Sequence, residues 1–166
     1  HIVLRRIEKK AKPLEFPLDL RVGTIVSVEN HPGAEQLYVV QIDLGEKRQL
    51  VAGLRKYYSP EQLVGKHVVV CANLKPAKIR GVTSQGMILA ADDAERVVVL
   101  EAPKTTPGAL VSMHGFENGR KQITIEEFVK LGLRVVDGKV VWNAAHLHTP
   151  AEDVIVNGVE NGAMVR

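Results

Sequence analysis

The side chains best suited to chemistry gather in one stretch, residues 73–87, which reads NLKPAKIRGVTSQGM. It carries positive charges together with neutral hydrogen-bonding groups: Asn73, Lys75, Lys78, Arg80, Thr83, Ser84 and Gln85. Pro76 and Gly81 disfavour a helix and predict a loop. Basic groups and neutral donors on one loop are typical of sites that hold phosphate, including a nucleic-acid backbone. Taken alone, such a charge run is more often a solvated surface loop, because exposed Lys and Arg are normal.

The distribution of charge favours the phosphate-binding interpretation. Residues 62–91 contain no acidic side chain, and their basic ones are Lys66, Lys75, Lys78 and Arg80. The whole chain has a net charge of only +3, so its composition alone does not indicate a nucleic-acid partner. A cluster of positive charge in an otherwise balanced chain is the electrostatic footprint of an anion or nucleic-acid site. Aromatic residues, which stack on single-stranded bases, are only 4% of the chain. A folded RNA recognised by shape is therefore favoured.

Signals for catalysis or metal binding are poor. The sequence has no phosphate loop, no dinucleotide fingerprint and no nucleophile elbow, since Ser84 lies in SQG rather than G-x-S-x-G. His146 and His148 suit one face of a strand, but no third ligand lies nearby. Cys71 is the one cysteine, which excludes an internal disulfide, and its valine-rich surroundings predict a small buried apolar side chain. We therefore expect no enzyme, no cofactor and no metal.

Short β-rich segments surround the basic stretch. Strands are expected at residues 20–28, 37–45, 49–53, 67–74 and 84–91, with a further candidate at 96–101. Ser59, Pro60 and Gly65 predict a short helix over residues 59–65 between the third and fourth strands. Gly23 inside the first strand predicts a bulge or sharp bend. A helix at that place among five strands is the arrangement of the OB-fold, so we predict a mainly β protein whose five-stranded barrel spans residues 19–102.

The flanking segments differ from the barrel. Residues 1–18 are basic and carry Pro13 and Pro17, which predicts a linker from a longer protein, consistent with a first residue that is not Met. Residues 103–166 predict a helix at 124–132 and a hairpin around the Asp-Gly pair within 133–143. This second section is small for an independent domain and is expected to pack on the barrel. Neither a signal peptide nor a membrane-spanning helix is expected.

Four ordered motifs resemble one known family: DLRVGTI (19–25), HPGAEQLYV (31–39), VAGL (51–54) and NLKPAKIRGVTSQGM (73–87). The family is the tRNA-binding domain of the free-standing bacterial tRNA-binding protein, of the C-terminal appendices of methionyl- and tyrosyl-tRNA synthetases, and of endothelial monocyte-activating polypeptide II. The resemblance implies an OB barrel that binds tRNA without sequence specificity and delivers it to a synthetase. It places the RNA contacts at Asn73, Lys75, Lys78, Arg80, Ser84, Gln85 and Met87. The basic residues would hold phosphates, the neutral polar ones would bond to the RNA, and Met87 would be an apolar contact or core.

The resemblance also implies partners and a second function. Residues 103–166 are similar to the C-terminal extension of the polypeptide II group, which replaces a second subunit, so a monomer is expected. Methionyl, tyrosyl and lysyl synthetases, or a free-standing cofactor, all fit as the parent protein, and the expected location is the cytoplasm. The alternative function is a cytokine-like polypeptide, secreted after proteolysis. Its heptapeptide would be Arg21, Val22, Gly23, Thr24, Ile25, Val26 and Ser27, although Thr24 stands where a basic residue is common; the simpler interpretation is a bent first strand.

Overall fold

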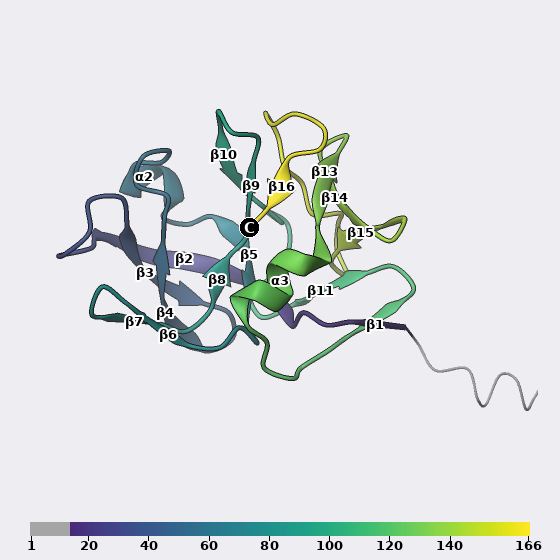
Figure 1. The fold of residues 1–166 in the computed structure, drawn as a ribbon, viewed down its shortest axis with the longest axis horizontal. Helices are drawn as coiled ribbons and strands as arrows, with labels where there is room; N and C mark the ends of the chain where they lie inside the picture. Colours follow the sequence, from purple (N-terminus) through teal and green to yellow (C-terminus); the bar gives the residue numbers. More distant parts are fainter. Residues whose placement is uncertain (1–13) are drawn as a thin grey trace, which may run out of the picture.

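The computed structural model describes residues 14–166, which form a mainly β protein (Figure 1). Most of the predicted linker, residues 1–13, lies outside the described residues. The described end of that segment forms strand β1 (Leu14–Phe16), which pairs in parallel with β12 (Phe116–Asn118). Phe16 and Leu18 are fully buried. Residues 14–18 are therefore part of the fold, and Phe16 and Leu18 part of its core, although the sequence placed them in a linker.

The first half of the chain supplies the elements that surround the basic stretch. These elements are β2 (Leu20–Asn30), β3 (Tyr38–Asp43), β4 (Lys47–Ala52), α2 (Pro60–Leu63), β5 (His67–Cys71), β6 (Ala77–Ile79), β7 (Val82–Ser84), β8 (Met87–Ile88), β9 (Ala90–Asp92) and β10 (Val97–Val99). The long strand β2 pairs with β3 on one side and β5 on the other, β3 continues to β4, and β5 to β8. The predicted short helix is present, with a Ser59 capping box and Pro60 in its first turn.

The predicted closed barrel is not confirmed, because the described strands form open sheets. No ladder joins β4 to β8 in residues 14–166. In its place, the Gln85 N–H donates to Gln49 O at 2.8 Å, and the Val51 N–H donates to the Ser84 hydroxyl at 2.9 Å. A side-chain oxygen thus accepts a bond that a ladder would give to a backbone carbonyl. Beside it the chain turns at Gly86, where an added Cβ would lie 2.9 Å from Cys71 O, so only glycine fits there.

The second half continues the sheet of the first. Its elements are β11 (Leu110–Met113), β12, α3 (Ile125–Leu131), β13 (Arg134–Val136), β14 (Lys139–Trp142), β15 (Ala145–His148) and β16 (Met164–Val165). Strand β11 pairs with β2, and β16 pairs with β9. The predicted helix is confirmed, with a capping box at Thr124 and a left-handed Gly132 at its end. The predicted hairpin is also confirmed, since Asp137 and Gly138 both adopt positive φ between β13 and β14.

Two hydrophobic clusters form the core, and one of them spans both halves. The smaller cluster lies within the first half and includes Ile42, Leu50 and Val99. The larger joins β2 and β5 of the first half to Phe128 of α3 and Leu147 of β15. The second half (green to yellow in Figure 1) therefore packs against the first along an apolar face. The division into units at 19–102 and 103–166 remains a prediction.

Candidate nucleic-acid interface

The basic stretch is more regular than the predicted loop, because its centre is a β-hairpin. Strands β6 and β7 pair antiparallel, with Lys78 opposite Thr83 and Ile79 opposite Val82. The two turn residues, Arg80 and Gly81, have φ values of 50° and 88°. Positive φ at both positions is the type I′ geometry that suits the twist of a hairpin. Ile79 and Val82 are half-buried, whereas Lys78 and Thr83 are exposed, so one hairpin face is anchored and the other is open to solvent.

The three cations of the stretch are available to an anion. Lys75, Lys78 and Arg80 are all exposed. Within residues 14–166, none of them forms an ion pair with an acidic side chain. The ion pairs of the described residues lie elsewhere, as in the Lys66–Glu101 pair at 3.0 Å. The structure thus places Lys78 and Arg80 on the hairpin and Lys75 just before it, all three without an acidic partner in residues 14–166.

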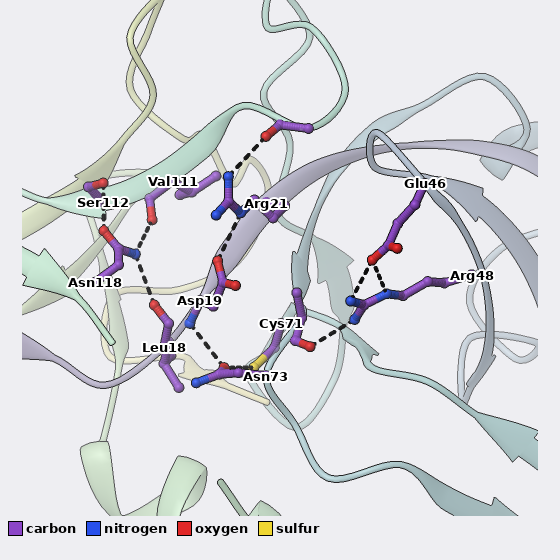
Figure 2. A network of polar contacts seen from close by, with 12 residues as sticks. Leu18, Asp19, Arg21, Glu46, Arg48, Cys71, Asn73, Val111, Ser112 and Asn118 are labelled. Carbon is purple, nitrogen blue, oxygen red and sulfur yellow. Dashed lines mark hydrogen bonds and ion pairs between the residues drawn. The ribbon is translucent and has the colours of Figure 1, made fainter. Parts of the chain in front are cut away.

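Asn73 is buried at the start of the stretch, and its amide, whose bond to Asp19 is drawn in Figure 2, ties three segments together. Its Oδ1 accepts from the Asp19 N–H at 2.9 Å, and its Nδ2 donates to Pro17 O at 2.9 Å and to Lys121 O at 2.8 Å. Both amide hydrogens are therefore used inside the protein. The resemblance implied a bond from Asn73 to RNA, whereas the geometry leaves its side chain no spare donor.

Arg48 on β4 clamps the base of the stretch, a role that the sequence did not reveal. Its Nη1 donates to Ala72 O at 2.8 Å and to Gln85 O at 3.3 Å, which lie just before and near the end of residues 73–87. The Glu46 carboxylate accepts from Nε and Nη2 of the same guanidinium, at 3.0 and 2.7 Å (Figure 2). Both nitrogens donate to the same carboxylate oxygen, Oε1, and these two bonds together with those to Ala72 O and Gln85 O orient the guanidinium. Arg48 therefore holds the two ends of the hairpin segment at a fixed separation.

The remaining predicted contact residues lie where the stretch returns to the sheet. Ser84 is buried, and its hydroxyl accepts from Val51 N–H and donates to Gly86 O at 3.0 Å. Gln85 is exposed, and its Oε1 accepts from Gln49 N–H at 3.1 Å, while its amide nitrogen has no hydrogen-bond partner within residues 14–166. Met87 is half-buried and packs against the larger cluster. Gln85 is thus the neutral residue best placed to reach a ligand.

His31 anchors the hairpin near its tip, although the sequence indicated only a turn at HPGAE. The imidazole is buried, its Nδ1 accepts from the Gly33 N–H at 2.9 Å, and its Nε2 lies 3.0 Å from Ile79 O. Because Nδ1 is an acceptor, Nε2 carries the proton and donates to Ile79 O. Gly33 itself approaches Arg80 O. The hairpin is therefore fastened at its base by Arg48, at its side by Ser84, and near its tip by His31.

The proposed cytokine heptapeptide, Arg21–Ser27, lies within β2 and is paired on both sides. Arg21 donates to Asp19 at 2.8 Å and to Gly108 O at 3.3 Å, while Val22 and Ile25 are buried. Only Val26 of the seven has an exposed side chain. The bulge of β2 falls between Ile25 and Ser27, near the bend expected at Gly23. This stretch presents little surface to a receptor.

The cysteine and the possible metal ligands of residues 14–166 are the candidates for a second site. Cys71 is buried, and burial raises the pKa of its thiol to about 12, so it is an inert apolar side chain as predicted. In the described part of the chain, no three His, Cys, Asp or Glu side chains converge in a way that could hold a metal ion. No helix within residues 14–166 is long and apolar enough to cross a membrane.

Comparison with known proteins places these features in a family. A family model described as "Putative tRNA binding domain" matches residues 20–109. Methionine–tRNA ligase of Thermococcus kodakarensis is 57% identical over 104 residues, which cover 58% of this chain and 14% of the ligase. Cytoplasmic tyrosine–tRNA ligase of Xenopus tropicalis is 45% identical over 111 residues, 63% of this chain and 21% of the ligase. The chain thus spans about a seventh to a fifth of the length of these curated relatives.

Two solved structures resemble the fold. The C-terminal domain of Plasmodium vivax p43 superposes with a TM-score of 0.82 at 25% identity, covering 90% of this chain and 96% of that one. A MetRS-related protein from Pyrococcus horikoshii gives a TM-score of 0.53 at 30% identity, covering 64% of this chain and 94% of the other. The likeness to the Plasmodium domain therefore reaches into the second half, residues 103–166.

Proposed function

The chain belongs to the tRNA-binding domain family, and we propose that it is a non-catalytic module that raises the tRNA affinity of an aminoacyl-tRNA synthetase. The observation that carries the proposal is the fastened hairpin, which holds Lys75, Lys78 and Arg80 exposed and without acidic partners. Cations held in place in this way neutralise phosphates and release counterions, whatever the base sequence. The synthetase would be covalently linked or docked, and methionyl- and tyrosyl-tRNA ligases are the parents favoured by the relatives.

Each residue of the site has a proposed role. Lys75, Lys78 and Arg80 bind phosphates, and Gln85 donates its free amide to the RNA backbone or to a 2′-hydroxyl. Asn73 and Ser84 act indirectly, since their hydrogen-bonding groups hold the hairpin in place. Met87 lines the side of the hairpin as an apolar neighbour. Because the sequence of residues 73–87 contains no aromatic side chain, recognition rests on charge and shape.

The architecture proposed for this module is an OB-type unit over residues 19–102, with residues 103–166 in the place of a second subunit. Strands β2 to β5 and the segment around Ser84 supply the five strands of the unit, with side-chain bonds at the β4 edge. The larger hydrophobic cluster already covers β2 and β5 with the second half, so a second copy is unnecessary. We therefore propose a monomer that works in the cytoplasm, where tRNA is charged.

The test is tRNA binding by the unmodified chain and by K75A/K78A/R80A, measured by fluorescence anisotropy between 50 and 200 mM salt. Three phosphate contacts contribute about −2 to −3 to the slope of log K against log salt. The triple variant should lose that share of the slope and bind more weakly at every salt concentration. K56A/K104A/K130A removes the same charge from three exposed lysines outside residues 73–87 and serves as the matched control. Equal affinity of the unmodified chain and the hairpin variant would refute the proposed site.

The cytokine alternative gains no supporting observation, since Arg21–Ser27 is a paired strand with one exposed side chain. A chemotaxis assay on myeloid cells would separate the two functions, because the hairpin variant retains β2 unchanged. Activity in that assay that survives K75A/K78A/R80A would revive the alternative.

A further inference from the structure

A second group of cations lies beside the hairpin, and it comes from the second half of the chain. The two cations, Arg120 and Lys121, are exposed in the segment between β12 and α3, and the neutral Gln122 beside them is exposed as well. Backbone bonds hold this segment against the start of the basic stretch: Lys75 N–H donates to Ile123 O at 2.8 Å, and Ile123 N–H to Asn73 O at 2.9 Å. The Asn73 amide adds its bond to Lys121 O. Segments nearly 50 residues apart in sequence are thus fixed side by side.

A polar groove separates these cations from the turn between β3 and β4. It encloses about 500 Å³, and its charged walls are Asp19, Glu46, Lys47, Arg48 and Arg120. The two acids are compensated, because Asp19 pairs with Arg21 at 2.8 Å and Glu46 with Arg48 at 2.7 Å. Lys47 and Arg120 are exposed and have no acidic partner within residues 14–166. The uncompensated charge of the groove is therefore positive.

The groove also continues the proposed interface. Asn73, Leu74, Pro76 and Gln85 of the basic stretch form one of its walls, so the groove directly adjoins the proposed site. We infer that the tRNA-binding surface extends from the hairpin across this groove onto the second half, where Arg120 and Lys121 bind phosphates of the same RNA. This inference rests on the proposed function. It gives residues 103–166 a direct part in binding, beyond covering the apolar face of the first half.

The inferred occupant is the sugar–phosphate backbone of a folded RNA. A row of uncompensated cations along a polar groove complements a row of phosphates. The backbone ties described above hold Arg120 and Lys121 at a fixed distance from Lys75, so the two groups can be engaged at once by a rigid duplex. Flexible cations on separate elements would require the RNA to order them first, which weakens binding.

The experiment compares R120A/K121A with K104A/K130A in the full chain, again by tRNA anisotropy across 50 to 200 mM salt. Both variants remove two exposed charges from the second half, and neither removes a side chain that holds the Asn73 tie, because that tie uses the Lys121 carbonyl. R120A/K121A should lower the magnitude of the salt slope by about 2, since each lost phosphate contact removes about 0.9. The control variant should keep the slope of the unmodified chain.

The outcomes separate this inference from the proposed function. An unchanged slope and affinity for R120A/K121A, with loss of binding in K75A/K78A/R80A, would overturn the inference and leave the hairpin site standing. A chain that fails to bind tRNA would defeat both. Thermal melting of each variant checks that it is folded, and the charge reversal R120E/K121E should weaken binding further than R120A/K121A. Binding of R120E/K121E equal to that of the unmodified chain would also overturn the inference.

Discussion

We propose that Asn73 positions the hairpin and makes no contact with the RNA, because its amide bonds to three protein groups. Its replacement by alanine removes three hydrogen bonds of 2.8 to 2.9 Å. Each such bond contributes a net 0.5 to 1.5 kcal/mol, or about 1.5 to 4.5 kcal/mol for the three. Burial of the site excludes the lower part of that range, because the stranded backbone groups are poorly hydrated. We expect Asn73→Ala to lower the free energy of unfolding by about 3 kcal/mol.

The assay is urea unfolding at 25 °C, followed by circular dichroism, with tRNA affinity measured on the same protein. A loss of about 3 kcal/mol leaves a typical domain, whose stability is about 5 to 15 kcal/mol, folded in buffer. Asn118→Ala is the matched control (Figure 2). Its amide donates to Leu18 O at 2.9 Å and Val111 O at 2.8 Å and accepts from the Ser112 hydroxyl at 2.7 Å. Asn118 makes a similar tie away from the hairpin.

Both variants should lose stability, and only Asn73→Ala should also weaken tRNA binding, because it loosens the hairpin base. A stability change below about 0.5 kcal/mol for Asn73→Ala would refute the reasoning, since no buried set of three bonds is that weak. A loss of tRNA affinity at unchanged stability would place the amide directly on the RNA, as the family resemblance implied.

Two further predictions concern the turn and the buried thiol. Arg80→Asn should stabilise the hairpin by a few tenths to about 1 kcal/mol in thermal melts, because Asn tolerates the φ of 50° better than Arg, while the lost charge reduces the tRNA salt slope by about 1. A variant that melts earlier would contradict the turn geometry. The Cys71 thiol should resist Ellman's reagent at pH 8 until urea unfolds the chain. Reaction of the native thiol with the reagent at pH 8 would contradict its burial. Because burial raises the pKa of the thiol from 9.0 to about 12, its contribution to the free energy of unfolding should decline as pH rises from 9 toward 12, relative to Cys71→Ala.

Elements with local signals could be predicted from the sequence. Ser59 and Pro60 begin α2, Thr124 caps α3, and Asp137-Gly138 turns the hairpin between β13 and β14. In each case the side chain that determines the structure lies within a few residues of the structure it determines. The charge cluster at Lys75, Lys78 and Arg80 was visible for the same reason, because clustering along the sequence is preserved on a hairpin.

Features that depend on distant partners could not be predicted. Strand β1 pairs with a strand about 100 residues away, and nothing in the sequence LEF indicates that partner. The hairpin β6–β7 turns at Arg80, a residue type that rarely adopts positive φ. Local residue preferences therefore did not predict this turn. The edge of β4 forms hydrogen bonds with the Ser84 hydroxyl and the Gln85 backbone but no ladder. The periodicity of apolar residues does not predict such bonds. These interactions belong to the tertiary fold.

The same distinction explains how the site works. The cations proposed to bind phosphate lie close together in the sequence. The groups that hold them in place, Asn73, Arg48 and His31, act through backbone atoms of remote segments. Charge alone sets a salt-dependent affinity for any polyanion. The ties fix the spacing of those charges. A folded RNA whose phosphates match that spacing binds without further ordering, whereas an unstructured RNA must be ordered first, which weakens its binding. We therefore expect the site to discriminate a folded RNA from an unstructured one. Loosening the ties should therefore reduce preference for folded tRNA over single strands more than it reduces total affinity, and removal of a cation should do the reverse.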